Sequence, residues 1–402
     1  MTSTVDYRRR LADELTDKGT IHSSWLRQAF TEIPREVFVP RFHRSEPGRE
    51  GIIDGTDPEQ REQWLDGIYT DQVLVVQYTP APAMHGQGAP TSSSSMPTVM
   101  AGMLETLDVQ PGHRVLEIGT GTGYNTALLC HRVGADNVAS VELDPALADS
   151  AGRALASIGL HPTVRVGDGA AGLAHAAPYD RIIATAAADH IPPDWITQLT
   201  PGGVIVTDLR GSLAGGILRL TAATESNADE PPTEVDTVHG RFLNLPGAFM
   251  PMRAHVDQPS RGGEDWDKIV YNQTNPHQGS TEINPVLITQ DRSLRLLTQL
   301  HLAGRRLRGF LRSADDTELS GAAIDGSWFA VGLQPDSDGR YGVAQGGPQR
   351  LWDTVEVAHA TWERLSRPSI KQFGVTAHDN LYTQHVWFDQ TDSGDYRWPL
   401  PL

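Results

Sequence analysis

The most chemically suggestive residues in the sequence are three glycines at alternate positions. Gly119, Gly121 and Gly123 lie in the run VLEIGTGTGY (115–124), between a short apolar segment and a stretch that is typical of a helix. Glycine has no Cβ, so the backbone of such a turn can approach a bound molecule closely. A tight strand-to-helix turn would also explain the glycines alone, so the interpretation depends on the acidic residues around them.

Acidic residues follow at the ends of the next two apolar segments. Glu142 comes about twenty residues after the glycines, where a carboxylate can accept hydrogen bonds from both hydroxyls of a ribose. Asp168 ends the third segment and can accept a hydrogen bond from an adenine amino group. With Glu117 inside the first segment, this pattern suits S-adenosylmethionine, and its product S-adenosylhomocysteine, better than a dinucleotide, because no pyrophosphate has to be held. The predicted cofactor-binding residues are Glu117, Gly119, Thr120, Gly121, Gly123, Tyr124, Glu142, Leu143, Asp168 and Gly169.

The elements that must position these residues alternate regularly between strand and helix. β-branched runs separated by Ala/Leu-rich stretches indicate a doubly wound, mostly parallel sheet of α/β class with crossover helices. Such a sheet binds its ligand outside the carboxyl ends of the strands, where the acidic residues fall. The predicted strands are 113–119, 137–143, 162–168, 180–187 and 202–209.

Helices are predicted near 7–16, 24–33 and 97–107, and they should form an N-terminal cap on the sheet. The Gly/Ser-rich stretch 86–95 is interpreted as a loop that ends at the start of the third helix. Two further strands are predicted within 216–224 and 239–253, and they complete the first domain.

The chain is predicted to divide into three parts. Residues 1–253 form the cofactor-binding domain with its cap, and the Pro/Gly-rich polar segment 254–285 is a linker. Residues 286–402, with mixed helical and strand patterns, form a smaller C-terminal α+β domain. We expect this accessory domain to recognise the substrate through aromatic side chains, some of which should belong to its core: Trp328, Phe329, Trp352, Trp362, Trp387 and Phe388.

Several segments together resemble the protein-L-isoaspartate O-methyltransferases. The resemblance covers roughly residues 20–253 and is strongest in EIGTGTGYNTALL (117–129). The other matching segments, in order, are IPREVFVP (33–40), YTDQVLVV (69–76), SSSSMP (92–97), GDG (167–169), YDRIIATAAADHIP (179–192) and QLTPGGVIV (198–206). The resemblance implies a Rossmann-like class I fold that binds S-adenosylmethionine and methylates a carboxylate.

The resemblance also implies an active-site loop. In the family this loop reads Thr-x-Ser-x-Pro followed by His or Tyr, and it corresponds here to Ser93, Ser95 and Pro97, with Thr98 in place of the aromatic residue. Asp71 matches an acidic position ahead of the loop, although a surface or capping role is an equal alternative. The predicted catalytic residues are Ser95, Ser93, Thr98 and Asp71. A plain helix cap is the alternative explanation of the serines.

A carboxylate substrate needs little chemical activation. Its reference pKa of about 3.9 leaves it anionic near pH 7, so catalysis is mainly alignment and desolvation. The methyl ester formed is a better electrophile, and the following backbone amide can attack it to close a succinimide (aspartimide).

Two substrate hypotheses follow from the departure at Thr98 and from the long C-terminal extension. The first is methylation of an Asp in a cyclised ribosomal peptide, as in variants associated with graspetide or lanthipeptide maturation, leading to aspartimide and isoaspartate. The alternative is repair of isoaspartate in damaged proteins, whose enzymes are commonly shorter. A noncatalytic scaffold is disfavoured because Gly119, Gly121, Glu142 and Asp168 are all present.

Composition limits the partners and the location. The formal net charge of −17 would repel a phosphate backbone, so nucleic acid is not expected as a partner, whereas a peptide or protein is. The sequence has no long apolar run and no secretory pattern, so we expect a cytoplasmic protein with no membrane contact. The histidines show no metal-ligand spacing, and Cys130, the single cysteine, is expected to be a buried thiol.

Overall fold

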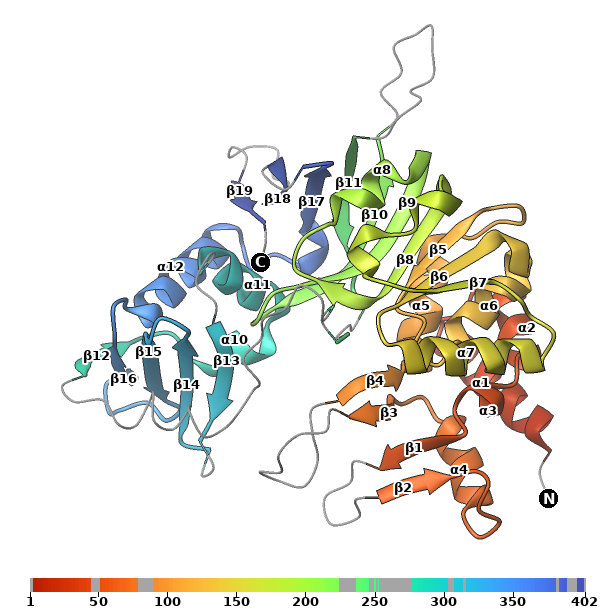
Figure 1. Cartoon of the computed structure of the whole chain (residues 1–402). Coiled ribbons are helices and arrows are strands. Elements are labelled where there is room, and N and C mark those ends of the chain that lie inside the picture. Colours follow the sequence, from red (N-terminus) through yellow and green to blue (C-terminus); the bar gives the residue numbers. More distant parts are fainter. Residues whose placement is uncertain are drawn as a thin grey trace, which may run out of the picture.

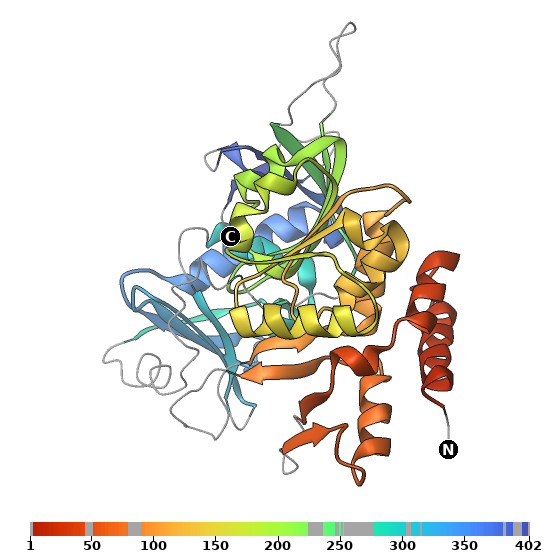
Figure 2. The same ribbon diagram turned by 45° about the vertical axis from the view of Figure 1, so that its right-hand side comes forward.

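The structure is a computed structural model. It describes residues 3–44, 51–78, 90–223, 236–245, 249–250, 252, 276–302, 307–313, 316–380, 383–388 and 396–400. Figures 1 and 2 show a large mixed sheet that connects an N-terminal group of helices and strands to a second, antiparallel sheet.

The centre of the molecule is the parallel part of a ten-stranded sheet, in the order β7-β6-β5-β8-β9. Its strands are β5 (Val115–Ile118), β6 (Val138–Glu142), β7 (Thr163–Val166), β8 (Tyr179–Ala188) and β9 (Leu199–Arg210). All five predicted strands are therefore confirmed. The strand order reverses between β5 and β8, which places the switch point of this Rossmann-like α/β fold beside the glycine turn.

Crossover helices follow β5 and β6. Helix α6 (Tyr124–Val133) begins at the glycine turn, and helix α7 (Pro145–Ser157) begins at Asp144, whose carboxylate accepts hydrogen bonds from the backbone N–H groups of the first helical turn. Helix α8 (Pro193–Thr197) lies between β8 and β9. Helix α5 (Pro97–Leu107), with Pro97 at its first position as predicted, packs against β8 and β9.

The N-terminal region contains the predicted helices α1 (Thr4–Asp17) and α2 (Ser24–Glu32), and also the short helices α3 (Arg35–Phe38) and α4 (Arg61–Ile68). It also contains a four-stranded sheet, which the sequence did not suggest. The sheet has the order β2-β1-β3-β4 and comprises β1 (Arg41–Arg44), β2 (Gly51–Asp54), β3 (Leu74–Tyr78) and β4 (Pro90–Ser94).

The prediction that 86–95 is a loop was wrong for its second half. Residues 90–94 form β4, which pairs antiparallel with β3, so that Ser94 lies opposite Leu74 and Ser93 opposite Val75. The backbone partners offered by β3 override the low strand propensity of a segment made of Pro, Thr and three Ser residues. Residues 86–89 lie outside the described part of the chain.

Antiparallel strands extend the main sheet beyond β9. They are β10 (Gly215–Ala222), β11 (Thr237–Phe242), β17 (Phe373–His378), β18 (His385–Phe388) and β19 (Tyr396–Pro399). Strand β11 pairs with β17, with Val238 opposite Ala377. Strands from the end of the chain thus belong to the same sheet as the glycine turn.

The remaining C-terminal elements form the second sheet and its helices. The sheet, in the order β12-β16-β15-β14-β13, consists of β12 (His277–Thr281), β13 (Leu307–Arg312), β14 (Glu318–Ala323), β15 (Trp328–Gly332) and β16 (Tyr341–Gly346). The helices are α10 (Val286–Gln290), α11 (Arg292–His301) and α12 (Leu351–Arg364). One hydrophobic cluster runs from β5 and β8 into α11 and α12. The division into 1–253, 254–285 and 286–402 stays a prediction, and both the sheet pairing and the core cross it.

The aromatic side chains expected to grip a substrate are mostly core residues. Five of the six are buried, namely Trp328, Phe329, Trp352, Trp362 and Phe388, while Trp387 is half-buried under Arg241. Helix α12 packs on β15, and the ring centres of Phe329 and Trp352 lie 5.2 Å apart. The five buried residues therefore cannot form an aromatic surface for a substrate.

Cys130 is buried in α6 and unbridged, as predicted. Within the described residues, no helix is long and apolar enough to cross a bilayer, and no three His, Cys, Asp or Glu side chains are grouped to hold a metal.

Candidate active site

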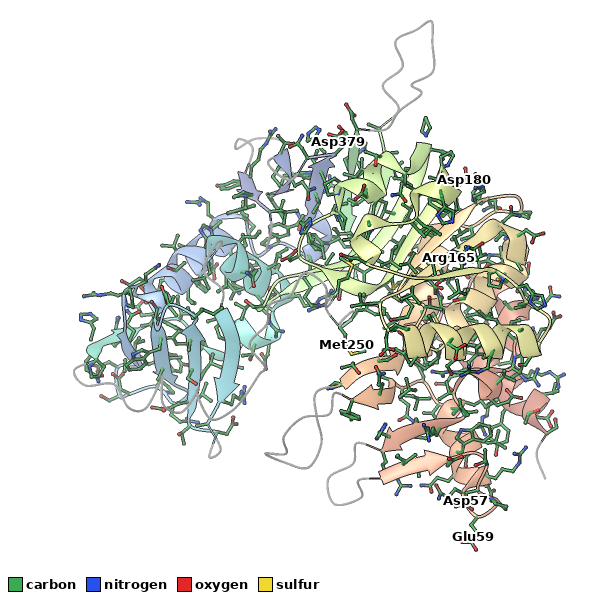
Figure 3. The ribbon with its side chains drawn as sticks, in the orientation of Figure 1. Asp57, Glu59, Arg165, Asp180, Met250 and Asp379 are labelled. Atoms are coloured by element: carbon green, nitrogen blue, oxygen red, sulfur yellow. The ribbon has the colours of Figure 1, made fainter. Side chains whose placement is uncertain are left out.

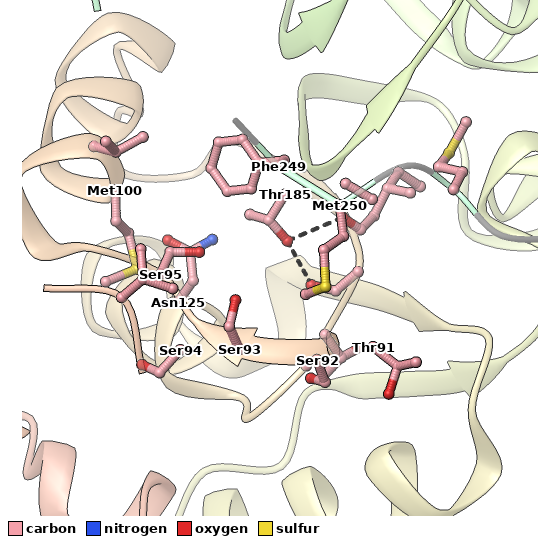
Figure 4. A pocket seen from close by; sticks show the side chains of 18 of the residues that line it. Thr91, Ser92, Ser93, Ser94, Ser95, Met100, Asn125, Thr185, Phe249 and Met250 are labelled. Carbon is pink, nitrogen blue, oxygen red and sulfur yellow. Dashed lines mark hydrogen bonds between the residues drawn. The ribbon is translucent and has the colours of Figure 1, made fainter. Parts of the chain in front are cut away.

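A cavity of about 630 Å³ opens at the carboxyl ends of the parallel strands, where the switch-point argument places a ligand (Figure 4). Its walls come from the glycine turn, the ends of β6 and β7, the serine-rich segment 90–96, and residues 249, 250 and 252. Met250, labelled in Figure 3, lies on the last of these. The backbone of Met250 and Met252 bonds to Ala187 at 2.8 and 2.9 Å, which fixes this segment to the end of β8.

The glycine turn is held open by backbone conformation and by Glu142. Gly119 and Gly121 have φ values of +90° and +54°, in the left-handed region that favours glycine. A Cβ on Gly119 would lie 3.0 Å from Thr185 Oγ1, and that hydroxyl donates to the Gly119 carbonyl at 2.7 Å. The Glu142 carboxylate accepts from Gly121 N at 2.8 Å and from Asp144 N at 3.0 Å.

Glu117 supports the turn from beneath and does not line the cavity. Its fully buried carboxylate accepts hydrogen bonds from Asn125 Nδ2 at 2.7 Å, Thr126 Oγ1 at 2.5 Å and Ser140 Oγ at 2.7 Å. Burial nevertheless raises the pKa of Glu117 to about 7. Gly123 also lies outside the cavity, because a Cβ there would face Ala151 of α7 at 3.1 Å.

The other eight predicted cofactor residues all line the cavity: Gly119, Thr120, Gly121, Tyr124, Glu142, Leu143, Asp168 and Gly169. The donor set fits S-adenosylmethionine. Each Glu142 oxygen accepts one backbone hydrogen bond and keeps a further lone pair for a ribose hydroxyl. At Gly169 an added Cβ would collide with Ile118 Cγ2 at 2.4 Å, so this part of the wall also requires glycine.

Along the serine-rich segment buried and half-buried serines alternate, and all four, Ser92 to Ser95, contribute to the cavity wall. Ser93 and Ser95 are half-buried and line the cavity, and Figure 4 shows the Ser93 side chain pointing into it. Ser94 is buried and accepts a hydrogen bond from Arg35 at 3.0 Å. Both predicted catalytic serines therefore reach the same cavity as the glycine turn.

Arg35 fixes this segment, and the sequence did not suggest such a role. Its fully buried guanidinium donates to Ile68 O at 2.8 Å and to Ser95 O at 3.1 Å, and its Cζ lies 5.6 Å from the centre of the Tyr124 ring. The available signal was an arginine inside the family-like segment IPREVFVP. Nothing in that segment shows that a loop sixty residues later closes over it.

Thr98 and Asp71 are brought together, but neither lines the cavity. Asp71 accepts hydrogen bonds from Thr98 N at 2.8 Å, from the Thr98 hydroxyl and from Lys18 Nζ at 2.9 Å. Burial alone would raise the pKa of Asp71, but the bonds from Thr98 and Lys18 lower it below its ordinary value. The geometry is that of a cap on the first turn of α5. A catalytic role for either residue stays a prediction.

Sequence reasoning also missed several residues that line the cavity, one beside the glycine turn and the others from distant segments. Asn125 donates to Glu117, and its buried Oδ1 has no hydrogen-bond partner among the described residues. Phe249 forms part of the apolar wall. Arg210, Arg292 and Arg295 add three positive charges from β9 and α11. Only the folded chain brings these side chains together.

Comparison with known proteins gives consistent matches to one family. The family model described as "Protein-L-isoaspartate(D-aspartate) O-methyltransferase (PCMT)" matches residues 49–213. The protein-L-isoaspartate O-methyltransferase of Hyperthermus butylicus is 37% identical over 209 residues, which cover 50% of this chain and 73% of that protein. Protein-L-isoaspartate O-methyltransferase 1 of Anaeromyxobacter sp. is 36% identical over 224 residues, covering 55% and 87%. A solved protein-L-isoaspartate O-methyltransferase aligns with 94% of this chain and 98% of its own at 22% identity and a TM-score of 0.48.

Proposed function

Because the chain belongs to the protein-L-isoaspartate O-methyltransferase family, we propose that it methylates the carboxylate of an isoaspartyl residue in a peptide or protein. The chain is an S-adenosylmethionine-dependent carboxyl O-methyltransferase of class I fold. Bound S-adenosylmethionine supplies an electrophilic methyl group. The residues that would hold it are those of the glycine turn, with Glu142 at the ribose and Asp168 at the adenine.

The composition of the cavity wall is the observation that supports a carboxylate as the methyl acceptor. Among its described lining residues there is no histidine and no lysine, and its carboxylates, Glu142 and Asp168, lie at the predicted cofactor end. A hydroxyl or amine acceptor would call for a general base near the methyl group. A carboxylate is ionised near pH 7 and attacks without one, so this wall suits a carboxylate.

The serine-rich segment then supplies alignment. Hydroxyl groups of Ser93 and Ser95 can donate hydrogen bonds to an acceptor carboxylate without neutralising it. Arg35 holds the backbone of Ser95 from the buried side, so the segment is ordered before the substrate arrives. Closure of the methyl ester to a succinimide is an attack by the substrate's own amide and requires no group from the protein.

Of the two substrate hypotheses, the comparisons favour isoaspartate over maturation of a cyclised ribosomal peptide, since the matching relatives are isoaspartate methyltransferases. The structure weakens the argument from Thr98 and the expectation of an aromatic substrate surface. Thr98, the residue that departs from the family pattern, bonds to Asp71 and does not line the cavity. The aromatic residues that were to grip a cyclised peptide are mainly core. No observation specifically favours aspartimide formation in a graspetide or lanthipeptide precursor.

A matched pair of peptides tests the proposal. The two peptides share one sequence and differ only in carrying L-isoaspartate or L-aspartate at one position. We expect methyl ester formation on the isoaspartyl peptide, followed by release of methanol and appearance of the succinimide, with little transfer to the aspartyl peptide. Ser95→Ala is the matched variant and should slow transfer. Preferential methylation of the aspartyl peptide would overturn the substrate assignment.

A further inference from the structure

Three arginines form one wall of the active-site cavity, and the proposed methyl transfer does not use them. Arg210 lies at the end of β9, and Arg292 and Arg295 lie in the first turn of α11. We call these three residues the arginine wall. The helix follows the polar segment after β11, so the wall combines the parallel sheet with the C-terminal part of the chain.

Counted over the described residues alone, the wall carries an excess of positive charge. Arg210 forms a two-bond ion pair with the fully buried Asp208, at 2.8 and 3.2 Å, and Asp208 also accepts from Phe249 N at 3.0 Å. Arg292 donates to two uncharged oxygens, Leu245 O at 3.0 Å and Asn244 Oδ1 at 3.4 Å.

Arg295 likewise donates to uncharged oxygens, the carbonyls of Ile288 at 3.2 Å and of Thr289. The carboxylate of Asp291 accepts hydrogen bonds from Ser293 Oγ and Leu294 N and thereby caps the N-terminus of α11. Three arginines therefore line the cavity, and within the described part of the chain the ion pair seen among them is that of Arg210 with the buried Asp208.

The three charges also repel one another in a partly desolvated place. Arg292 and Arg295 are half-buried, and the pKa of each is lowered, first by burial and next by the charge of Arg210. An anion bound at the wall would relieve this repulsion. Guanidinium groups bind carboxylates through paired hydrogen bonds, which a lysine wall would not provide.

The chemistry of methyl transfer argues against the wall binding the carboxylate that is methylated. The acceptor carboxylate loses its charge when the ester forms, so strong ion pairing would stabilise the reactant more than the transition state and would slow the reaction. Hydroxyl groups such as those of Ser93 and Ser95 suit that carboxylate. Arginines suit an anion that stays charged throughout.

We propose that the arginine wall binds a second carboxylate of the substrate, either an acidic side chain adjacent to the isoaspartyl residue or the C-terminal carboxylate of a short peptide. The proposal rests on the proposed function and narrows its substrate class to isoaspartyl peptides with a neighbouring negative charge. The protein's own net charge of −17 would disfavour such substrates, and a local positive wall at the cavity counteracts this.

Four isoaspartyl peptides of one sequence test the proposal. One has neutral flanks and an amidated C-terminus, one carries Glu before the isoaspartyl residue, one carries Glu after it, and one has neutral flanks and a free C-terminal carboxylate placed close to it. We measure kcat/KM for methyl transfer and, separately, peptide binding by fluorescence anisotropy with S-adenosylhomocysteine present. For at least one charged peptide, kcat/KM should exceed that of the neutral peptide about tenfold or more. The peptide that shows this preference identifies the source of the carboxylate.

Arg292→Gln and Arg295→Gln should each reduce this ratio about tenfold, and Arg295→Lys should restore part of it by keeping the charge. Arg312, on β13, forms an exposed ion pair with Asp316. Arg312→Gln removes an equal charge there and should leave the ratio of kcat/KM between charged and neutral peptides unchanged. Arg210 is not substituted, because its loss would leave Asp208 buried without its partner. Binding of S-adenosylhomocysteine checks that each variant is folded.

The outcomes separate the two claims. Turnover of all four peptides at similar rates by the wild-type protein overturns the arginine wall and leaves the proposed function standing. A preference that survives in both Gln variants also overturns it. Selective binding of charged peptides, lost in the variants, without any methylation supports the wall and refutes isoaspartyl turnover.

Discussion

Glu117→Gln should remove a pH dependence from the stability of the protein. In the folded protein, burial raises the pKa of Glu117 to about 7 from an ordinary value of 4.5. Between these two values the folded state keeps a proton that the unfolded state has lost, so unfolding releases a proton and becomes easier as the pH rises. The stabilisation is complete below pH 4.5 and is lost as the pH approaches 7. At 1.36 kcal/mol per unit, the loss is about 3 kcal/mol.

The glutamine variant has no such proton. The difference in the free energy of unfolding between variant and wild type therefore isolates the contribution of the Glu117 proton. Oε1 of Gln can still accept from Asn125, while the hydroxyl groups of Thr126 and Ser140 must turn to accept from Nε2, which shifts the variant by an amount independent of pH. Urea unfolding at several pH values from 4.5 to 8 measures the difference in the free energy of unfolding. We expect it to move by about 3 kcal/mol in favour of the variant across this range.

Glu356→Gln on the exposed face of α12 is the matched control, and its difference from wild type should stay flat. A flat difference for Glu117→Gln as well would refute the argument. It would mean that the hydrogen bonds from Asn125, Thr126 and Ser140 hold the carboxylate ionised in spite of its burial.

Three further substitutions test the site. Glu142→Ala should weaken S-adenosylmethionine binding about tenfold to a hundredfold in calorimetry, because hydrogen bonds to a charged group are lost; unchanged affinity contradicts the ribose assignment. Ser95→Ala should lower kcat/KM by about tenfold or more while cofactor affinity stays near that of wild type, and wild-type turnover would reduce the serine to a helix cap. Thr98→Val removes the hydroxyl bond to Asp71 and should cost about 1 kcal/mol of stability with methylation retained; a collapse of methylation would return Thr98 to the active site.

The parallel part of the fold could be predicted because its signals are local. The strands at 115–118 and 138–142 are buried and mostly apolar, and the glycines between β5 and α6 are required by the backbone angles that the structure shows. Glu142 is the last residue of β6 and Asp168 follows the end of β7, so their place at the cavity follows from the strand direction.

The remainder depends on contacts between residues far apart in the sequence. Strand β4 has a composition typical of a loop and becomes a strand through pairing with β3. Arg35 is buried beneath Ser94 and Ser95 only once the N-terminal helices pack. The arginine wall joins positions in β9 and α11, and no local pattern links them.

The pairing of β11 with β17 has a consequence for how the protein is made. Strand β11 ends at Phe242, and its partner β17 begins at Phe373. During synthesis β11 therefore stays unpaired while the ribosome translates the intervening residues, which takes on the order of ten seconds at ordinary translation rates. Throughout that interval the nascent sheet presents an edge with unpaired backbone groups, which can pair with a neighbouring chain. A protein cut after about residue 254 would keep that edge permanently. Ribosome-bound chains of increasing length should therefore become resistant to protease, and lose their tendency to aggregate, only after β17 has emerged.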